Sequence, residues 1–370
     1  MKIPGCKTTY TSSDYSWLSK YLDTSSRGII ENLEAKLAEI HNIKHVVTVS
    51  NGTAALFVLY QALGMGMSGS DDPPDLLIVP SYTWPSAANA AAMLGAKVLF
   101  MDINPDTLNI EPHALEGLLA TARGSYRRIF VVQIHQFGLV ENSKSVRRIC
   151  DEYGAVHIED AAWTLGSSVP LAGVAGIWSF HPRKLVNGGE GGAIYTDDDH
   201  LADACRRYRN HGLDDEGNFS VFALNFRLPV IQAGLIHNQL NRIEYLIQER
   251  KRIADFYYSA FAGIEGISLP PKSENHLWQA FVLRLEDYDV SNFKDFCEKK
   301  GVEIAHAGFS THREKAWVSN LLDIQPDLTK TTRYENSYVL LPSFEGMTTD
   351  DLEYTVNTIK EALSSVKCSC

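Results

Sequence analysis

The stretch "SFHPRKLVNGGEGGAIYT", residues 179–196, holds one lysine between a short apolar run and a glycine-rich turn. A lysine beside glycines is typical of a phosphate-binding loop, but that loop requires the order G-x-x-x-x-G-K-[ST]. Here Lys184 precedes the glycines of the turn, so this explanation fails. The first expected strand is followed by "SNGTAAL" and not by a G-x-G-x-x-G motif, so the dinucleotide-binding pattern fails as well. The role of this lysine must be inferred from the elements around it.

Short runs of β-branched and aliphatic residues recur through the first half of the chain. They are "HVVTVS" from His45, "LLIVP" from Leu76, "KVLFMDI" from Lys97, "RIFVVQI" from Arg128, "AVHIED" from Ala155, "GIWSF" from Gly176 and "GAIYT" from Gly192. Helical patterns such as residues 53–64 and 145–154 separate them. This alternation predicts an α/β fold, a mostly parallel seven-stranded sheet between layers of helices. Too little chain joins the last two runs to hold a helix, so at least one of these strands is expected to be antiparallel.

The second part of the chain has a different pattern. A long helical segment starts at Pro229, a suitable first-turn proline, and runs toward Phe261, and a bend is expected at this length. Residues 263–275 are predicted to form a linker or an irregular segment, followed by a strand from Leu277 and a helix over residues 291–301. A last helix opens with the capping-box spacing of Thr348 and Asp351. We therefore predict a large domain over residues 1–250 and a small α+β domain over residues 251–370.

Composition limits the classes of partner. The chain has 370 residues, a net charge of −11 and no long basic run, which argues against nucleic-acid binding. The amino terminus lacks an apolar signal core, and no uninterrupted apolar stretch approaches the ~20 residues of a membrane span. We expect a cytoplasmic protein that does not bind membranes. The six cysteines lack the paired spacing of a zinc site, and Cys368 and Cys370 are interpreted as incidental, so no metal is predicted.

Ligands of parallel α/β sheets bind beyond the carboxyl ends of the strands, and unusual residues stand at several such ends. In "SNGTAAL", Gly52 allows close approach of a ligand, and Thr53 with the free N–H groups of a helix can hold a dianion. Asp160 ends the run "HIED", and Trp84 follows another strand in "PSYTWPS". Each also has an ordinary explanation: a helix cap for Thr53 and Asp160, and core packing for Trp84.

Ser179 and Lys184 complete this group of residues. Alone, Lys184 would be interpreted as a solvated side chain. Together with a phosphate-binding helix start, a carboxylate at a strand end and an aromatic plate, it fits one cofactor, pyridoxal 5'-phosphate (PLP). That cofactor requires a lysine that forms an imine with its aldehyde, a carboxylate for its pyridinium nitrogen and a cradle for its phosphate.

Over nearly its whole length the chain resembles the DegT-type PLP-dependent aminotransferases, which act on keto-sugars attached to nucleotides. The matching motifs are "GTAAL", "VPSYTWPSAANA", "IHQFG", "IEDAAWTLG", "SFHPRKLVNGGEGG", "LNFRLPVIQAG" and "LLPSFEGMT". The resemblance implies the aspartate aminotransferase-like fold, PLP fold type I. It also implies an amino donor, L-glutamate or L-glutamine, and a keto acceptor.

The resemblance implies a role for individual residues. Lys184 corresponds to the imine-forming lysine and Asp160 to the carboxylate that faces the ring nitrogen. The phosphate-binding positions correspond to Gly52, Thr53 and Ser179, and the aromatic residue over the ring to Trp84. Asn225, in "LNFRLP", corresponds to an asparagine that reaches the cofactor phosphate of the neighbouring subunit. A homodimer with shared active sites is therefore expected.

Several positions depart from the family pattern. Trp163 stands where Gln or His is usual beside the ring, and Asn187-Gly188 replaces a more usual Thr-Thr. Ala223-Leu224 precedes Asn225 where glycine is common, and the segment 211–225 is short. These departures leave the acceptor open: a nucleotide-linked hexose, an aminocyclitol precursor or another natural-product ketone. Residues 305–312, the amino-terminal segment and the partner subunit are expected to contribute to acceptor binding.

Other activities remain open from the residues alone. A branch of the family that deoxygenates sugars carries His in place of the lysine, so Lys184 argues against that reaction. The cofactor residues do not distinguish transamination from elimination or another lyase reaction. A PLP-binding regulatory protein without turnover is a third possibility.

Overall fold

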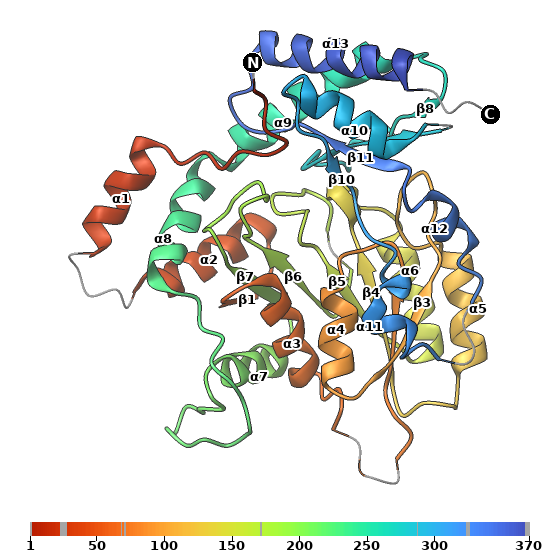
Figure 1. Ribbon diagram of the computed structural model, residues 1–370. Coiled ribbons are helices and arrows are strands. Elements are labelled where there is room, and N and C mark those ends of the chain that lie inside the picture. Colours follow the sequence, from red (N-terminus) through yellow and green to blue (C-terminus); the bar gives the residue numbers. More distant parts are fainter. Residues whose placement is uncertain are drawn as a thin grey trace.

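The computed structural model describes residues 2–22, 28–67, 69, 72–170, 172–286, 288–322 and 326–366 (Figure 1). Cys368 and Cys370, interpreted above as incidental, lie outside the described residues. The helices are α1 (Ser12–Leu22), α2 (Ile29–His41), α3 (Gly52–Ala62), α4 (Ser86–Met93), α5 (Pro112–Ala122), α6 (Ser143–Tyr153), α7 (Asp199–Arg209), α8 (Val230–Gln239), α9 (Ile243–Phe261), α10 (Val290–Lys299), α11 (Lys315–Val318), α12 (Thr329–Tyr334) and α13 (Thr349–Ser365).

The large sheet contains the strands expected from the apolar runs. They are β1 (His45–Val49), β2 (Leu76–Pro80), β3 (Lys97–Met101), β4 (Ile129–Ile134), β5 (Val156–Asp160), β6 (Ala175–Ser179) and β7 (Gly192–Thr196). Their order is β1-β7-β6-β5-β4-β2-β3. The strands from β6 to β3 pair in parallel, whereas β7 is antiparallel to both β6 and β1. The mostly parallel seven-stranded sheet and its antiparallel member are therefore confirmed.

Helices cover both faces of the large sheet because successive strand residues point to opposite sides. In β2, Leu77 and Val79 pack with α3 and α4, while Leu76 and Ile78 pack with α5 and α6. In β7, Ile194 joins the first of these layers, and its neighbours Ala193 and Tyr195 pack against α2 and α8. Strands buried on both faces are mostly apolar, which is why they form nearly continuous hydrophobic runs in the sequence.

A second, four-stranded antiparallel sheet has the order β10-β11-β9-β8. Its strands are β8 (Ile267–Ser268), β9 (Phe281–Leu285), β10 (Ala305–His306) and β11 (Tyr338–Leu341). It lies beside α10 and α13, apart from the large sheet (Figure 1). Its core also contains Ile3, from the other end of the chain. The domain boundary at residue 250 stays a prediction.

The structure refines several predicted boundaries. The long helical segment after Pro229 bends as expected, because a 3-10 turn at Leu240–Arg242 separates α8 from α9. Two predicted segments have the wrong residue bounds. The predicted linker contains β8, and the strand expected from Leu277 begins only at β9, because Trp278 has a φ of 52° that extended backbone cannot accommodate. The capping box of Thr348 and Asp351 at α13 is confirmed.

Two further findings concern the whole described chain. None of its helices combines the length and the apolar character needed to cross a membrane. Cys6, Cys150, Cys205 and Cys297 are all free thiols.

Candidate active site

A pocket of about 910 Å³ lies at the carboxyl ends of β4, β5 and β6, next to the start of α3. Ile134, Asp160 and Ser179 are the last residues of these strands, and all three line the pocket. The opposite wall comes from the second sheet, through residues 306–309 after the start of β10. The position agrees with the general location of ligand sites in parallel α/β sheets.

The pocket brings together six of the seven residues singled out from the sequence. Those that line it are Gly52, Thr53, Trp84, Asp160, Ser179 and Lys184. Asn225 does not line the pocket, although its neighbours Leu224 and Phe226 do. The roles of all seven residues stay predictions, because position alone does not establish chemistry.

Gly52, Thr53 and Ser179 form a cradle at the start of α3. A Cβ atom added to Gly52 would lie only 3.1 Å from Ser179 Cβ, so a larger residue here would crowd the cradle. Asn51 caps α3, because its Oδ1 accepts a hydrogen bond from the Ala54 N–H at 2.8 Å. Thr53 Oγ1 lies 2.8 Å from Ser86 Oγ, at the start of α4. Free N–H groups and hydroxyls at a helix start are suited to a phosphate dianion.

Asp160 provides the carboxylate of the pocket. Its Oδ1 accepts a hydrogen bond from the Ala162 N–H at 3.1 Å, which fixes the carboxyl group beyond the end of β5. Burial raises the pKa of Asp160, while this hydrogen bond and the positive charge of Lys184 oppose the increase. A cationic group bound against Asp160 would favour its ionised form.

A buried polar network supports the strand that carries Asp160. His135 Nε2 lies 3.1 Å from Glu159 Oε1, and Glu159 Oε2 accepts the N–H groups of Ala172 and Gly173. Burial would raise the pKa of Glu159, but the contacts with His135, together with His157 and the Gly173 N–H, outweigh burial and lower the pKa to about 2. The sequence motif "IHQFG" contains His135 but indicates no role for it. The signal that could have found this network is a histidine directly after buried β4 and a glutamate inside buried β5.

Lys184 projects from a tight turn toward the indole of Trp163. The Lys184 N–H donates to the His181 carbonyl at 2.8 Å, and Lys184 Nζ lies 3.3 Å from the centre of the Trp163 ring. Burial lowers the pKa of Lys184 to about 7, although Asp160 opposes this shift. The amine is therefore partly neutral near neutral pH, which a nucleophile or a proton carrier requires.

Replacing Trp163 by leucine should lower the pKa of Lys184 further. The negative face of the indole stabilises the ammonium form, so its loss favours the neutral amine, by about half a pH unit to one unit. The measurement is competitive acetylation of the cofactor-free protein across pH, followed by peptide mapping of Lys184. Trp163→Phe should give a smaller shift. Trp84→Leu, which removes a pocket tryptophan without this contact, is the matched control, and a Lys184 pKa that is unchanged or raised in Trp163→Leu contradicts the prediction.

The rim of the pocket is aromatic. Trp84 is 64% exposed and packs edge-to-face against Phe309, which is 42% exposed, with their ring centres 5.4 Å apart. Backbone hydrogen bonds from Thr83 N–H to the Phe309 carbonyl and from Thr311 N–H to the Ser81 carbonyl hold the two segments together. Two flat, exposed rings at a pocket mouth are suited to planar ligands.

These residues fit PLP, as judged from the chemistry of the groups present. The glycine and hydroxyl cradle would hold the phosphate, Asp160 would face a protonated ring nitrogen, and the Lys184 amine would bind the aldehyde carbon. Within the described residues, no group of three or more His, Cys, Asp and Glu side chains is arranged to hold a metal ion.

Comparison with known proteins gives consistent results. The DegT/DnrJ/EryC1/StrS aminotransferase family matches residues 22–360. GDP-perosamine synthase of Vibrio cholerae is 26% identical over 386 residues, covering 98% of this chain and 100% of that protein. PseC of Helicobacter pylori, an aminotransferase involved in the biosynthesis of pseudoaminic acid, is structurally similar with a TM-score of 0.90 at 20% identity, covering 99% of this chain and 100% of that one. NtdA of Bacillus subtilis, solved with bound cofactor PMP, has a TM-score of 0.87 at 22% identity, covering 98% of this chain and 86% of that one.

Proposed function

The chain belongs to the DegT/DnrJ/EryC1/StrS aminotransferase family, and from this premise we propose that it transfers an amino group from L-glutamate or L-glutamine to a nucleotide-linked keto-sugar. It is a PLP-dependent aminotransferase, as the sequence predicted. The observation that carries the proposed reaction is the convergence of Lys184, Asp160 and an anion cradle in one pocket. GDP-perosamine synthase, whose name denotes an amino-sugar nucleotide, supports the substrate class.

The proposed roles follow from the chemistry of the side chains. PLP, when bound, supplies an electron sink that stabilises negative charge at the substrate α-carbon. Lys184 Nζ would take the proton from that substrate carbon and deliver it to a carbon of the cofactor. This transfer is possible because the pKa of Lys184 is lowered to about 7. Asp160 holds a negative charge opposite the cationic ring nitrogen, and Gly52, Thr53 and Ser179 bind the phosphate. Trp84 would stack over the cofactor ring, and Phe309 packs against Trp84 at the rim.

The test is a direct assay of nitrogen transfer. The holoenzyme is incubated with ¹⁵N-labelled L-glutamate or L-glutamine and a panel of nucleotide-linked keto-sugars. An aminated sugar nucleotide should carry the label, in equal amount to the keto acid formed from the donor. Ammonia released without aminated product would indicate elimination. Cofactor binding without any turnover on the panel would favour the regulatory alternative, and either result overturns the proposal.

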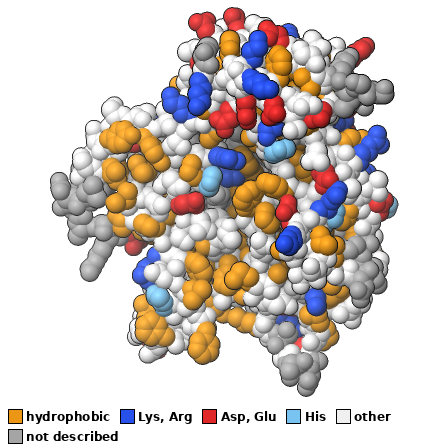
Figure 2. Space-filling model, in the orientation of Figure 1, with side chains coloured by type: hydrophobic (Ala, Val, Ile, Leu, Met, Phe, Trp, Pro, Cys, Tyr) orange, Lys and Arg blue, Asp and Glu red, His pale blue; other side chains and the backbone are white. Residues whose placement is uncertain are grey.

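We also infer a homodimer in which Asn225 completes the partner's site. The loop that carries Asn225 exposes large apolar side chains, with Phe219 73%, Phe222 101% and Leu224 60% exposed. Figure 2 shows hydrophobic side chains gathered at the lower left, where this loop lies below α7. Exposed apolar clusters mark interaction surfaces. Leu224 and Phe226 line the chain's own pocket while Asn225 between them does not, and its exposed side chain is available to a second copy.

The inferred shared site predicts complementation between two defective chains. A Lys184→Ala chain is mixed with an Asn225→Ala chain, and the subunits are allowed to exchange. In the heterodimer, the site built on the Asn225→Ala chain keeps Lys184 and receives an intact Asn225 from its neighbour. Activity should therefore rise above that of the Asn225→Ala homodimer.

Failure of this rescue would contradict the shared site. In the single chain, Asn225 Oδ1 accepts a hydrogen bond from the Arg227 N–H at 3.2 Å, an ordinary loop contact. If exchange is verified and Asn225→Ala is impaired but not rescued, Asn225 acts within its own chain, and the shared site is wrong.

A further inference from the structure

The amino-terminal segment, residues 3–14, runs from the side of the second sheet to α1 (Figure 1). Its first residues belong to the second sheet's unit. Ile3 forms a parallel bridge with Val302 and donates its N–H to the Gly301 carbonyl at 2.7 Å. The Gly5 N–H donates to Glu303 Oε2 at 3.2 Å, which ties the segment to the residues just before β10.

The middle of the segment lies along the turn that carries Lys184. Thr8 Oγ1 donates to the Pro182 carbonyl at 3.2 Å, two residues before the lysine. The Tyr10 hydroxyl donates to Asn187 Oδ1 at 3.0 Å, three residues after it. The two contacts therefore bracket Lys184. Asn187 supplies the acceptor of the Tyr10 hydroxyl through its side chain.

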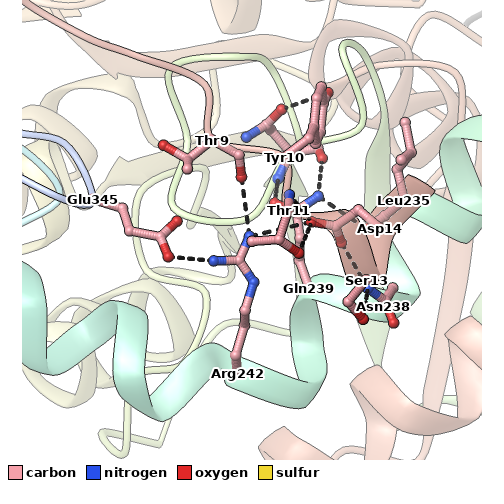
Figure 3. A network of polar contacts seen from close by, with 11 residues as sticks. Thr9, Tyr10, Thr11, Ser13, Asp14, Leu235, Asn238, Gln239, Arg242 and Glu345 are labelled. Atoms are coloured by element: carbon pink, nitrogen blue, oxygen red, sulfur yellow. Dashed lines mark hydrogen bonds and ion pairs between the residues drawn. The ribbon is translucent and has the colours of Figure 1, made fainter. Parts of the chain in front are cut away.

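The far end of the segment is fixed by Arg242, at the end of the 3-10 turn between α8 and α9 (Figure 3). Its guanidinium donates to the Thr9 carbonyl at 3.0 Å and to Asp14 Oδ2 at 3.5 Å, and it forms an ion pair with Glu345. Asp14 is fully buried, and Asn238 Nδ2 donates to its Oδ1 at 2.7 Å. Hydrogen bonds to a charged group are stronger than those between neutral groups, so the bonds of Asp14 and Arg242 fix the position of this end of the segment.

The inner side of the turn is held by other bonds. Gln239 Nε2 donates to the Asn187 carbonyl at 2.6 Å, and the Asn187 N–H donates to Gln239 Oε1 at 3.2 Å. Both use the Asn187 backbone, so they do not depend on its side chain. The Asn187 amide oxygen, in a side chain only 4% exposed, is left to the Tyr10 hydroxyl. Tyr10 thus adds a side-chain hydrogen bond to a turn whose backbone is already held by Gln239.

We propose that Tyr10, assisted by Thr8, is a positioning residue that fixes the turn carrying Lys184 at the wall of the pocket. The proposal rests on the active-site role assigned to Lys184 above and adds a residue far from it in the sequence. With Pro182 and Asn187 both bonded to the segment, the turn is held from both sides of Lys184, which limits how far its amine can move out toward water. Loss of the hydrogen bonds from Thr8 and Tyr10 lets the turn open and exposes the Lys184 amine to more water.

The test measures Lys184 in the cofactor-free protein, so it does not depend on turnover. Tyr10→Phe and Tyr10→Phe combined with Thr8→Val are compared with the unmodified chain by competitive acetylation and peptide mapping across pH. Because burial lowers the pKa of Lys184 to about 7, rehydration should raise it toward its ordinary value of 10.5. We expect an increase of about half a unit for the single variant and about one unit for the double variant.

Tyr15→Phe is the matched control, because Tyr15 packs against Tyr10 with ring centres 6.4 Å apart but is 60% exposed. It should leave the pKa of Lys184 unchanged. The thermal unfolding midpoint of each variant is measured in parallel, and a pKa change without a comparable change at other lysines identifies a local effect. In the holoenzyme, the same variants should lose cofactor faster during dialysis, by about threefold to tenfold for a lost hydrogen bond.

A double-mutant cycle with Asn187→Ala decides whether Tyr10 acts through this contact. The alanine keeps the backbone bonds to Gln239 and removes only the amide that accepts from Tyr10. In this background Tyr10→Phe should have no further effect on the pKa of Lys184. Additive effects, or an unchanged pKa in the Tyr10→Phe and Thr8→Val double variant, overturn the proposal. If the pKa rises as expected but amino transfer is absent in every form, the proposed function fails and the positioning role stands.

Discussion

Replacing Lys184 by alanine should reduce amino transfer by at least about four orders of magnitude, because one side chain is proposed to bind the cofactor and to carry the proton. The variant should fold normally, since Lys184 makes no ion pair within the described residues. Borohydride reduction of the unmodified holoenzyme should attach the cofactor covalently to the peptide that contains Lys184. The variant should lack this label and the yellow colour of the lysine-bound cofactor.

The control for this experiment is Lys44→Ala. Its ammonium group pairs with Asp199 at 2.6 Å on the surface and its side chain is 55% exposed, so its loss should leave both activity and labelling intact. A label on another lysine, or activity within tenfold of normal in Lys184→Ala, would contradict the assignment.

Changing Asp160 to asparagine should lower kcat by about two to three orders of magnitude while most cofactor binding is retained. The substitution keeps an oxygen that can accept the Ala162 N–H and removes only the negative charge. Without that charge the ring nitrogen of the bound cofactor is no longer kept protonated, so the electron sink is weakened. The measurements are kcat with saturating substrates and the absorbance spectrum of the bound cofactor across pH.

Asp199→Asn is the matched control, because this carboxylate is 59% exposed and its pKa is lowered to about 2 by surface contacts with Lys44 and His45. It should not affect kcat. A near-normal kcat in Asp160→Asn would show that Asp160 is only the acceptor of a backbone hydrogen bond beyond β5.

The large sheet could be predicted from the sequence because its strands are buried on both faces. Every position in β2 and β4 is buried, so each strand is a mostly apolar run, with Gln133 the polar exception in β4. The start of β9 could not be predicted in this way. Residues 277–285 have strand-like composition, but Trp278 adopts a positive φ and stacks on His276 with ring centres 3.7 Å apart. That stacking joins residues only two positions apart in a local turn, which strand-like composition does not reveal.

The site was predictable where it depends on strand ends and less so where it depends on distant contacts. Asp160 and Ser179 end neighbouring strands, so pairing of those strands places them together. The contact of Lys184 with Trp163 requires the exact course of two loops, and no sequence spacing indicates it. The bond between Tyr10 and Asn187 joins residues 177 positions apart, and only the folded chain brings them together.

The amino-terminal segment also has a consequence for biosynthesis. Its partners Gly301, Val302 and Glu303 are translated some 300 residues after Ile3, and Glu345, which pairs with Arg242, is translated later still. Domains generally fold as units while the chain emerges from the ribosome, so the large sheet and the bonds from Thr8 and Tyr10 to the Lys184 turn can form before the partners of Ile3 and Gly5 exist. We therefore expect the first residues of the segment to be the last part of it to become fixed. A nascent chain would acquire its sheet first, and the connection from the Lys184 turn to the second sheet only when synthesis is nearly complete.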